Sequence, residues 1–556
     1  MGGTLSKVGT QYDQSTGTYT NTWPAPKIPK QSIIDYLFSS ISFDDNRVAF
    51  VEHGKTRKSI TYGQLKLEGW RLGQGLVKAG FKQGDVIMLC APNSIEWIIL
   101  LIASQFAGLT IALASSQYSP KDFKHVYTLT QPKKVFMPLK LSVKKAQARL
   151  PINCQIALDD SRGTAIPDMN RMKVSEEEAR KAKPRNPTDL ESTAILAFSS
   201  GTTGMPKAVE LSHRNVVSML TIIRCFPDVH DKPMRVLNTL PFFHAMALQL
   251  HIFLPIAVGS TVHIQVPFNP QLFLKLIAQE QIQSTVLVPP IAVAFANHPA
   301  VTKELFSSMI TFGCGGAPLD TKVQVKLAEK IQTDVAQGWG MTETTVGCLG
   351  IHSKMSPGTC GRVLPGIELK LIDPESGSPV EPGKRGEIWV RGPNIFKGYH
   401  KNPKATEETM TPDGFLKTGD IAYANEEGHF AIVDRIKELI KYKGNQVAPA
   451  ELEGLINRHP KVALSGVVGI YSEQQGTELP RAYIQLKPNT PKQGVEKEIE
   501  EYVKANASNP KWLRGGVSII PAIPATPSGK LLRKELRVLA KKEMQKFEGD
   551  PPQARL

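Results

Sequence analysis

Apolar and polar positions divide most of this chain into short buried strands and longer amphipathic segments. Short apolar runs occur at residues 86–90, 194–198, 236–240, 285–288 and 309–313. Between about residues 31 and 434 these runs alternate with stretches of helical periodicity. The alternation predicts α/β layers, in which helices cover largely buried strands.

The most hydrophobic stretch, residues 97–114, approaches the length of a membrane span. Polar residues and a glycine interrupt it at Ser104, Gln105 and Gly108. Because glycine breaks regular structure, the stretch is expected to form a helix followed by a strand, both buried. The sequence therefore predicts no integral membrane span.

Two later changes of pattern indicate further units. Near Gly366 the chain turns to short strands and turns, at residues 367–372 and 386–390, which indicates a small β-rich subdomain. Another unit begins near residue 435 and contains strand-like runs at 466–470 and 482–486, a charged helix at about 495–505 and a basic helix after residue 529.

The expected organisation follows from these patterns. The fold class is α/β: a large N-terminal α/β domain of stacked sheets with a small β-rich subdomain, and a smaller α+β C-terminal domain. The expected boundaries are an irregular arm at 1–30, the large domain at 31–434, the C-terminal domain at 435–545 and a tail at 546–556.

Composition narrows the class of function. The 556 residues carry a formal net charge of +16, which would suit anionic substrates, nucleic acid or a membrane surface. The positive charge is spread along the chain and no nucleic-acid-binding motif is present, so nucleic acid is not expected as a partner. The six cysteines are scattered without a C-x-x-C pair, which argues against a zinc site or a disulfide framework.

A glycine-rich turn joins two of the predicted strands, 194–198 and 208–212. Its sequence is Ser199-Ser200-Gly201-Thr202-Thr203-Gly204-Met205-Pro206-Lys207. Glycines let the backbone approach a polyphosphate, hydroxyl and N–H groups donate to its oxygens, and a lysine neutralises charge. The alternative is a polar hairpin loop without a ligand. The spacing differs from that of a Walker loop, which enters a helix.

This turn closely resembles the phosphate loop of the adenylate-forming superfamily, which includes acyl-CoA synthetases, luciferases and peptide-synthetase adenylation domains. That family usually has glycine after the lysine, where this chain has Ala208. The resemblance implies that the nucleotide's phosphates are bound by Ser199, Ser200, Gly201, Thr202, Thr203, Gly204 and Lys207.

A second motif is Gln337-Gly338-Trp339-Gly340-Met341-Thr342-Glu343. Glycines beside an aromatic ring let it lie flat against a planar partner, although such turns are also purely structural elements. The family usually has tyrosine where Trp339 stands, and an indole ring stacks as well as a phenol. The resemblance implies that Trp339 borders adenine, Thr342 bonds the α-phosphate and Glu343 holds Mg²⁺. It also implies that Gln337 and Gly338 bind the nucleotide.

Two further motifs lie near the predicted domain boundary. In Lys417-Thr418-Gly419-Asp420 a carboxylate after a glycine turn can bind a ribose diol, or the motif is an ordinary turn. The strip from Arg435 to Gln446 is rich in lysine and arginine, and the alternative is a solvent-exposed charged segment that binds no ligand. The resemblance implies ribose contacts from Asp420 and Arg435, a hinge at Lys437, adenylate contacts from Lys441 and Gln446, and a CoA path along Lys443 and Gly444.

The remaining motifs concern catalysis and the acyl group. In Pro527-Ser528-Gly529-Lys530 the resemblance implies that Lys530 is the catalytic lysine of adenylation, stabilising charge as it builds on phosphorus. It further implies that His244, a second catalytic candidate, gates an acyl pocket, and that Ala317 borders adenine. The pocket itself is expected to include His244, Met246, Gly313, Gly315 and Gly316.

Five motifs in family order imply a two-step reaction over residues 30 to 540, closest in pattern to 4-coumarate–CoA ligase-like and luciferase-like enzymes. A small carboxylic acid and Mg-ATP would give an acyl-adenylate and pyrophosphate, and coenzyme A would then give acyl-CoA and AMP. An adenylate former with another acceptor, oxygen or a carrier protein, stays open. A non-catalytic scaffold is the third alternative, disfavoured because every motif lysine and acid is present.

The chain ends make competing predictions about location. Ala554-Arg555-Leu556 resembles the Ser-Lys-Leu peroxisomal signal, which predicts a peroxisomal enzyme and an import receptor as partner. The start, with Gly2 and Ser6, fits the N-myristoylation pattern, which gives only marginal membrane binding. A cytoplasmic or membrane-tethered enzyme is therefore the alternative.

Overall fold

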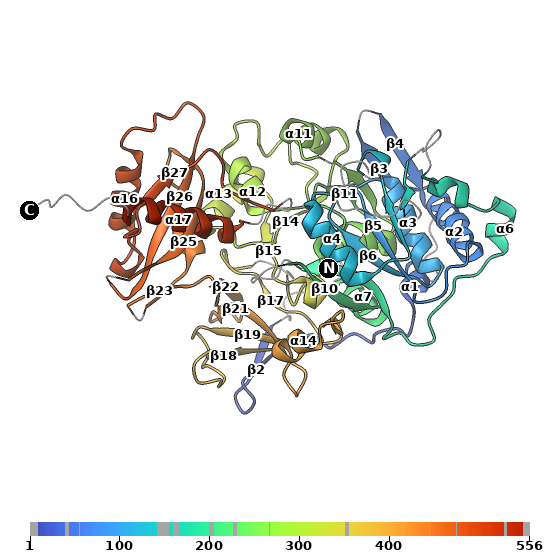
Figure 1. Ribbon diagram of the computed structural model, residues 1–556, viewed down its shortest axis with the longest axis horizontal. Helices are drawn as coiled ribbons and strands as arrows, with labels where there is room; N and C mark the ends of the chain where they lie inside the picture. Colours follow the sequence, from blue (N-terminus) through green and yellow to red (C-terminus); the bar gives the residue numbers. More distant parts are fainter. Residues whose placement is uncertain are drawn as a thin grey trace, which may run out of the picture.

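The computed structural model describes most of the chain in two units of unequal size (Figure 1). The described residues are 9–38, 44–54, 56–141, 155–159, 166–199, 205–225, 231–265, 267–350, 355–443, 445–473, 475–526 and 531–548, the last five by their backbone alone. The larger, N-terminal unit is α/β, and the smaller unit, drawn in orange and red, lies at one end of the molecule. The predicted fold class is thus confirmed.

The first large sheet contains the predicted strands 86–90 and 194–198. Its central strands are parallel, and β9 and β10 form an antiparallel hairpin in which Ser199 pairs with Lys207. In the described part of the chain the strand order is β20 (Gly398–Tyr399), β10 (Lys207–Ser212), β9 (Thr193–Ser199), β6 (Thr110–Ala114), β5 (Val86–Cys90), β7 (Lys134–Met137) and β8 (Gln155–Ala157).

The second large sheet is parallel except at the β4 edge. Since polar side chains that follow parallel strands meet at one edge of a sheet, it is a suitable platform for a site. Among described residues its order is β15 (Val335–Gln337), β14 (Thr311–Cys314), β13 (Ser284–Leu287), β11 (Arg235–Asn238), β12 (Thr261–Ile264), β3 (Val48–His53) and β4 (Arg57–Thr61).

The main hydrophobic core lies between these two sheets. Helix α3 (Ile95–Phe106) contacts β6 of the first sheet and β3 of the second, and nearly all its side chains are buried. A helix enclosed on all sides is apolar all round, which explains the membrane-like hydrophobicity of this stretch. Gly108, at φ +68°, ends it before β6, as the sequence predicted. No helix in the described ranges is long and apolar enough to cross a membrane.

Other helices cover the sheets. Helix α4 packs on the outer face of the first sheet, and α11, α12 and α13 pack on the outer face of the second. The helices of this unit are α1 (Ile33–Phe38), α2 (Tyr62–Lys78), α4 (Pro120–Thr130), α6 (Glu176–Lys181), α7 (His213–Arg224), α9 (Ala245–Ala247), α10 (Leu254–Val258), α11 (Pro270–Gln279), α12 (Pro289–Asn297), α13 (Thr321–Ile331) and α14 (Pro403–Thr409). Shorter turns are η4 (Met169–Met172), the π-helix η5 (Leu248–Phe253) and η6 (Thr342–Thr344).

A third sheet forms the predicted β-rich subdomain. The two strands at one edge of this sheet come from the N-terminal arm. The arm was expected to be irregular, but its Thr/Tyr-rich segments on either side of Gly17 (φ +66°) pair as a hairpin. Tyr19 then pairs with Leu369, which joins the arm to the sheet. The order is β1 (Thr10–Asp13), β2 (Thr18–Asn21), β18 (Glu368–Ile372), β19 (Gly386–Arg391), β21 (Leu416–Ala424) and β22 (Phe430–Arg435). A small ladder of β16 (Leu349–Gly350) and β17 (Arg362–Val363) lies beside it.

The smaller unit has a hydrophobic core of its own, built from residues between Ile440 and Ala540. A three-stranded sheet supports it, and helices α16 and α17 lie beside that sheet (Figure 1), while α15 contacts its strand β25. Its elements are β23 (Ile440–Tyr442), β24 (Asn445–Val447), α15 (Pro449–Ile456), β25 (Val462–Ser472), β26 (Thr477–Leu486), α16 (Val495–Asn506), η7 (Asn509–Lys511), β27 (Val517–Ile519) and α17 (Arg533–Glu548).

Candidate active site

The predicted phosphate loop lies at the end of the β9–β10 hairpin. Ser199 and Lys207 mark where the two strands end and pair with each other. Ser200, Gly201, Thr202, Thr203 and Gly204 lie outside the described residues, as do Lys530, Gly444, Gly2 and the tripeptide 554–556. The hairpin nevertheless shows where the loop begins and ends.

Ala208, where relatives usually have glycine, is accommodated within the core. It is 1% exposed and packs in a cluster with Leu196 and Phe123. Its carbonyl accepts a hydrogen bond from the His400 amide at 2.8 Å. The methyl group therefore adds buried apolar contact at the start of β10.

Glu343, the candidate metal ligand, is linked to Lys207 through a tyrosine. The Tyr399 hydroxyl donates to Glu343 Oε1 at 2.9 Å, and the Lys207 ammonium lies 4.5 Å from the centre of the Tyr399 ring. Glu343 is 3% exposed. Burial, followed by the charge of Glu343, raises the pKa of Tyr399, so its hydroxyl stays protonated and remains a donor. This places a carboxylate and an ammonium group close to the phosphate loop.

Trp339, Asp420 and Arg435 form one hydrogen-bonded group. The indole Nε1 of Trp339 donates to Asp420 Oδ2 at 2.8 Å, and Arg435 Nε donates to Asp420 Oδ1 at 3.0 Å. Asp420 and Arg435 are also register partners on β21 and β22. An ionised carboxylate has about four acceptor positions. Two positions therefore remain for further donors such as a diol.

The Gln337 side chain serves the scaffold of the site. Its Nε2 donates to Gln324 Oε1 at 2.9 Å, and its Oε1 accepts from the Leu319 amide at 2.9 Å. This arrangement fixes the segment after Ala317 against β15, so Gln337 itself can face a ligand only with its backbone. Nearby, a Cβ on Gly340 would meet the Val346 carbonyl at 1.9 Å, so only glycine fits there.

The predicted acyl-pocket residues are partly brought together. A Cβ on Gly315 would lie 3.0 Å from the Met246 sulfur, so these two segments touch. His244 precedes α9, is half-buried, and begins the turn that leads into the π-helix η5. Gly316, at φ +86°, allows the turn after β14, while Gly313 lies within that strand, 3.0 Å from Val286 by the same measure.

The cationic strip forms a turn and then a short hairpin. Lys437 is exposed in the turn after β22, whereas Lys441 and Gln446 are exposed register partners on β23 and β24. Lys443 follows at φ +45°, and its amide donates to Thr477 Oγ1 at 2.8 Å. The strip therefore presents three exposed lysines, Lys437, Lys441 and Lys443, and the Gln446 amide.

A buried ionic network, which the sequence did not reveal, adjoins this strip. Asp434 accepts from the Ala450 amide at 2.9 Å, and Arg533 lies 3.9 Å from it. Arg533 also forms a bidentate pair with Glu453, at 3.1 and 2.7 Å. Burial raises the pKa of Asp434. Since Arg533 follows Lys530 by three positions, this pair fixes the chain next to the predicted catalytic lysine.

The two units also touch directly. Arg458, two residues after the end of α15, lies 3.8 Å from Asp320, which caps the N-terminus of α13. A Cβ on Gly454 would come within 3.1 Å of the same carboxylate. The smaller unit thus rests on the segment that follows Ala317.

Comparison with known proteins defines the class. The chain matches the family described as AMP-binding enzyme over residues 40–400 and the AMP-binding enzyme C-terminal domain over residues 451–530. The chain belongs to the AMP-binding enzyme family, the adenylate-forming superfamily that the motifs indicated.

Relatives cover almost the whole chain. It is similar to the probable 4-coumarate–CoA ligase 3 of Dictyostelium discoideum, with 35% identity over 93% of this chain and 97% of that protein. It is 34% identical to the peroxisomal OPC-8:0-CoA ligase 1 of Arabidopsis thaliana, over 94% and 96% of the two chains. The structure of ATP-bound MatB from Rhodopseudomonas palustris has the same fold, with a TM-score of 0.81, 24% identity and coverage of 92% and 99%.

Proposed function

We propose that this protein is an ATP-dependent carboxylic acid–CoA ligase that works through an acyl-adenylate. Family membership supports adenylation, and the relatives named as CoA ligases support coenzyme A as the acceptor. The observation that supports the site most directly is the group formed by Trp339, Asp420 and Arg435. Residues far apart in the sequence converge there on one carboxylate with free acceptor positions.

In this proposal the nucleotide lies across that group. Asp420 binds the ribose diol, Arg435 orients Asp420 and contacts the ribose, and the Trp339 ring borders adenine together with Ala317. The triphosphate extends toward the hairpin end between Ser199 and Lys207, with Thr342 at the α-phosphate. Catalysis then consists mainly of positioning and of cations around the spread negative charge.

Mg²⁺ fits the chemistry of Glu343. Mg²⁺ bound with nucleotides commonly takes one or two carboxylates, phosphate oxygens and water. Glu343 offers one buried carboxylate, whose Oε1 is oriented by Tyr399 and whose neighbourhood includes Lys207. Bound there, the ion would neutralise charge on the pyrophosphate leaving group.

We further propose that the chain divides functionally at residues 434/435, with residues 31–434 binding ATP and the acid and residues 435–545 forming a mobile domain. The separate hydrophobic core of the smaller unit supports this division. Rotation about Lys437 would exchange Lys530, used in adenylation, for Lys443 and Gly444, which line the path of coenzyme A. Lys441 and Gln446 would approach the adenylate.

The acid is proposed to enter between Met246 and the glycines around Gly315, with His244 at the entrance. Pyrophosphate release measured over a panel of aryl and aliphatic acids, with and without coenzyme A, tests the function. Acid-dependent release together with acyl-CoA formation supports the ligase. Acid-dependent release without a CoA product would indicate another acceptor, oxygen or a carrier protein, and no release with any acid would contradict an enzyme.

We also propose a peroxisomal location, supported by Ala554-Arg555-Leu556 and by the peroxisomal relative. A fluorescent fusion at the N-terminus should be punctate and become diffuse when Leu556 is deleted. Diffuse fluorescence of the intact fusion would contradict the proposal. Membrane recovery of an untagged N-terminus that depends on Gly2 would support myristoylation instead.

A further inference from the structure

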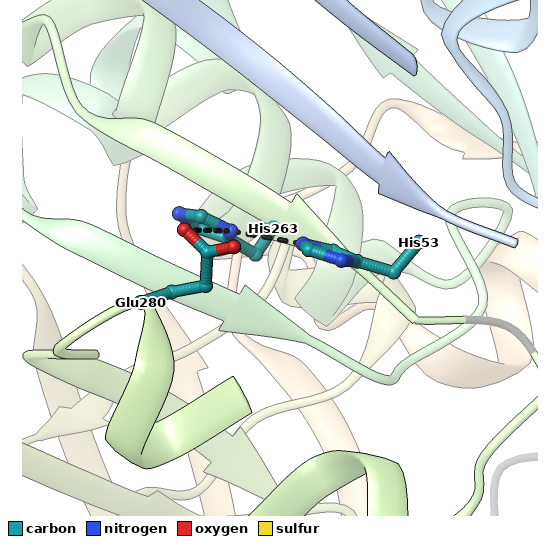
Figure 2. Close-up of side chains that lie close together, drawn as sticks. All are labelled: His53, His263 and Glu280. Atoms are coloured by element: carbon teal, nitrogen blue, oxygen red, sulfur yellow. Dashed lines mark hydrogen bonds and ion pairs between the residues drawn. The ribbon is translucent and has the colours of Figure 1, made fainter. Parts of the chain in front are cut away.

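Two histidines and a glutamate meet on the outer face of the second large sheet (Figure 2). His53 Nε2 lies 3.0 Å from His263 Nδ1, and Glu280 Oε2 lies 3.8 Å from the same His263 nitrogen. The potential ligand atoms of the three residues all lie within 4.8 Å of one another. We propose that this cluster binds a divalent transition metal ion, Zn²⁺ in the first instance.

The sheet brings the two imidazoles to the same face. His263 pairs with Val51 in the parallel ladder of β12 and β3, and His53 follows Val51 by two residues. Residues two apart in a strand point to the same face, so His53 and His263 both face α11. Glu280, the residue that ends α11, supplies the carboxylate. The ligands therefore come from three elements fixed by the core.

The separations suit a tetrahedral ion. With metal–nitrogen distances of about 2.0–2.1 Å, two nitrogens on one tetrahedral ion are roughly 3.3 Å apart. The two imidazole nitrogens need to open by only a few tenths of an ångström from their 3.0 Å separation. The two ring planes are inclined to each other by 20°, and His53 Nε2 and His263 Nδ1 are the ring atoms that face each other (Figure 2). Glu280 must approach by a comparably small movement.

The protonation state also suits a metal. The 3.0 Å contact between the facing nitrogens is a hydrogen bond between two imidazoles, which requires one of them to accept with a free lone pair. Metal ligation requires neutral imidazole. In the metal-free pair one of the two facing nitrogens carries the proton of this hydrogen bond. For metal binding, that ring adopts its other tautomer, so that both facing nitrogens offer lone pairs.

The ligand set selects among metals. Two imidazoles and one carboxylate are typical of Zn²⁺ and neighbouring transition ions, whereas Mg²⁺ and Ca²⁺ require oxygen ligands. Arg57 is the competing cation, 3.4 Å from Glu280, but its side chain is 61% exposed and can move into solvent. Three protein ligands leave a fourth position for water. The ion would tie β3, which lies between β4 and β12, to β12 and to the end of α11.

Cobalt(II) titration of the full, untagged chain tests the site, because tetrahedral Co²⁺ absorbs strongly in the visible region. We expect a tetrahedral spectrum at one equivalent of Co²⁺, which Zn²⁺ abolishes by displacement. His53→Gln and Glu280→Gln should each weaken binding by on the order of a hundredfold. His298→Gln, which changes an exposed histidine elsewhere, should leave it unchanged.

Thermal unfolding supplies a second readout that needs no activity. Zn²⁺ at about a hundred times its dissociation constant should raise the melting temperature of the wild type, and this rise should be lost in His53→Gln. The proposal is overturned by an octahedral spectrum alone, or by binding and stabilisation that both ligand variants retain. Comparable metal-free melting temperatures for the wild type and His53→Gln would show that the variant folds.

Discussion

The indole nitrogen of Trp339 donates a hydrogen bond to Asp420 across 81 positions of the sequence, at 2.8 Å. The indole ring reaches the carboxylate directly. Trp339 is 8% exposed, so the bond is shielded from water. This hydrogen bond therefore couples the ring that is proposed to border adenine to the carboxylate that is proposed to bind the ribose.

Trp339→Phe should raise the KM for ATP by roughly tenfold with a smaller change in kcat. The variant keeps an aromatic ring but removes one hydrogen bond to a buried charge, which contributes about 1.5–3 kcal/mol. Steady-state kinetics of acid-dependent pyrophosphate release measures the change. The matched control is Trp512→Phe, which removes an indole bond to the Ala507 carbonyl in the smaller unit. Equal KM values for both variants would contradict the role of Trp339.

Tyr399→Phe should raise the Mg²⁺ concentration needed for half-maximal adenylation by several-fold and leave the rate at saturating Mg²⁺ largely intact. The variant removes the hydrogen bond that orients Glu343, and a hydrogen bond to a charged group contributes about 1.5–3 kcal/mol. Magnesium titration of the pyrophosphate-release rate gives the result. Tyr483→Phe breaks a similar tyrosine–glutamate bond, to Glu543, and serves as the control. An unchanged magnesium requirement in Tyr399→Phe would argue against Glu343 as the ligand.

Lys530→Ala should lower the rate of adenylate formation by on the order of 10²–10³ and spare thioester formation from supplied acyl-adenylate. The reason is the loss of a cation that acts on the transition state. Lys534→Ala, an exposed lysine in the first turn of α17, is the matched control. Single-turnover assays of each half-reaction separate the two effects. Wild-type adenylation by Lys530→Ala would show that the assignment is wrong.

Lys443→Glu should have the opposite effect, slowing thioester formation while leaving adenylation intact. A negative charge in an exposed turn at φ +45° would repel the anionic phosphates of coenzyme A. The same two half-reaction assays measure this, with Lys461→Glu, elsewhere in the smaller unit, as control. If both half-reactions slow equally, the two surfaces do not alternate.

The free energy of unfolding should fall as pH decreases from about 6.5 to about 4, in part because of His213. Burial lowers the pKa of His213 from 6.5 to about 4, so the unfolded chain takes up a proton first as pH falls. Stability is therefore fully present above pH 6.5 and is lost toward pH 4, at up to about 1.4 kcal/mol per pH unit for one proton. His213→Gln should reduce this slope in urea titrations at several pH values, and the exposed His298→Gln should not. Equal slopes in all three proteins would refute the contribution of His213.

Local pattern predicted much of the fold. The run at residues 86–90 is β5, and the interrupted hydrophobic stretch becomes α3 and β6, divided at Gly108. Apolar spacing and glycine position contain this information because they act within a few residues. The β1–β2 hairpin was not predicted, since it is completed by β18, some 350 positions later, and no short-range signal specifies that pairing.

In the candidate site, too, the motifs were predictable from local sequence, whereas the contacts between distant segments were not. Motifs located Asp420, Arg435 and Trp339, but not the bonds among them, which depend on how β21 and β22 pair. The contact of Tyr399 with Glu343 arises because β20 joins the edge of the first sheet, a pairing that no local pattern specifies. Arg533 and Glu453 carried no signal, since a charged pair separated by 80 residues resembles any two solvated charges in a sequence.

The contacts of Asp434 bear on the rate of the proposed domain rotation. Asp434 belongs to β22, yet its partners Ala450 and Arg533 lie beyond the proposed hinge at Lys437. A pivot at Lys437 must break these contacts in every catalytic cycle and make them again. The free-energy barrier to breaking these contacts would then limit the rate of the domain rotation. Substitution of Asp434 would therefore change the time between the two half-reactions.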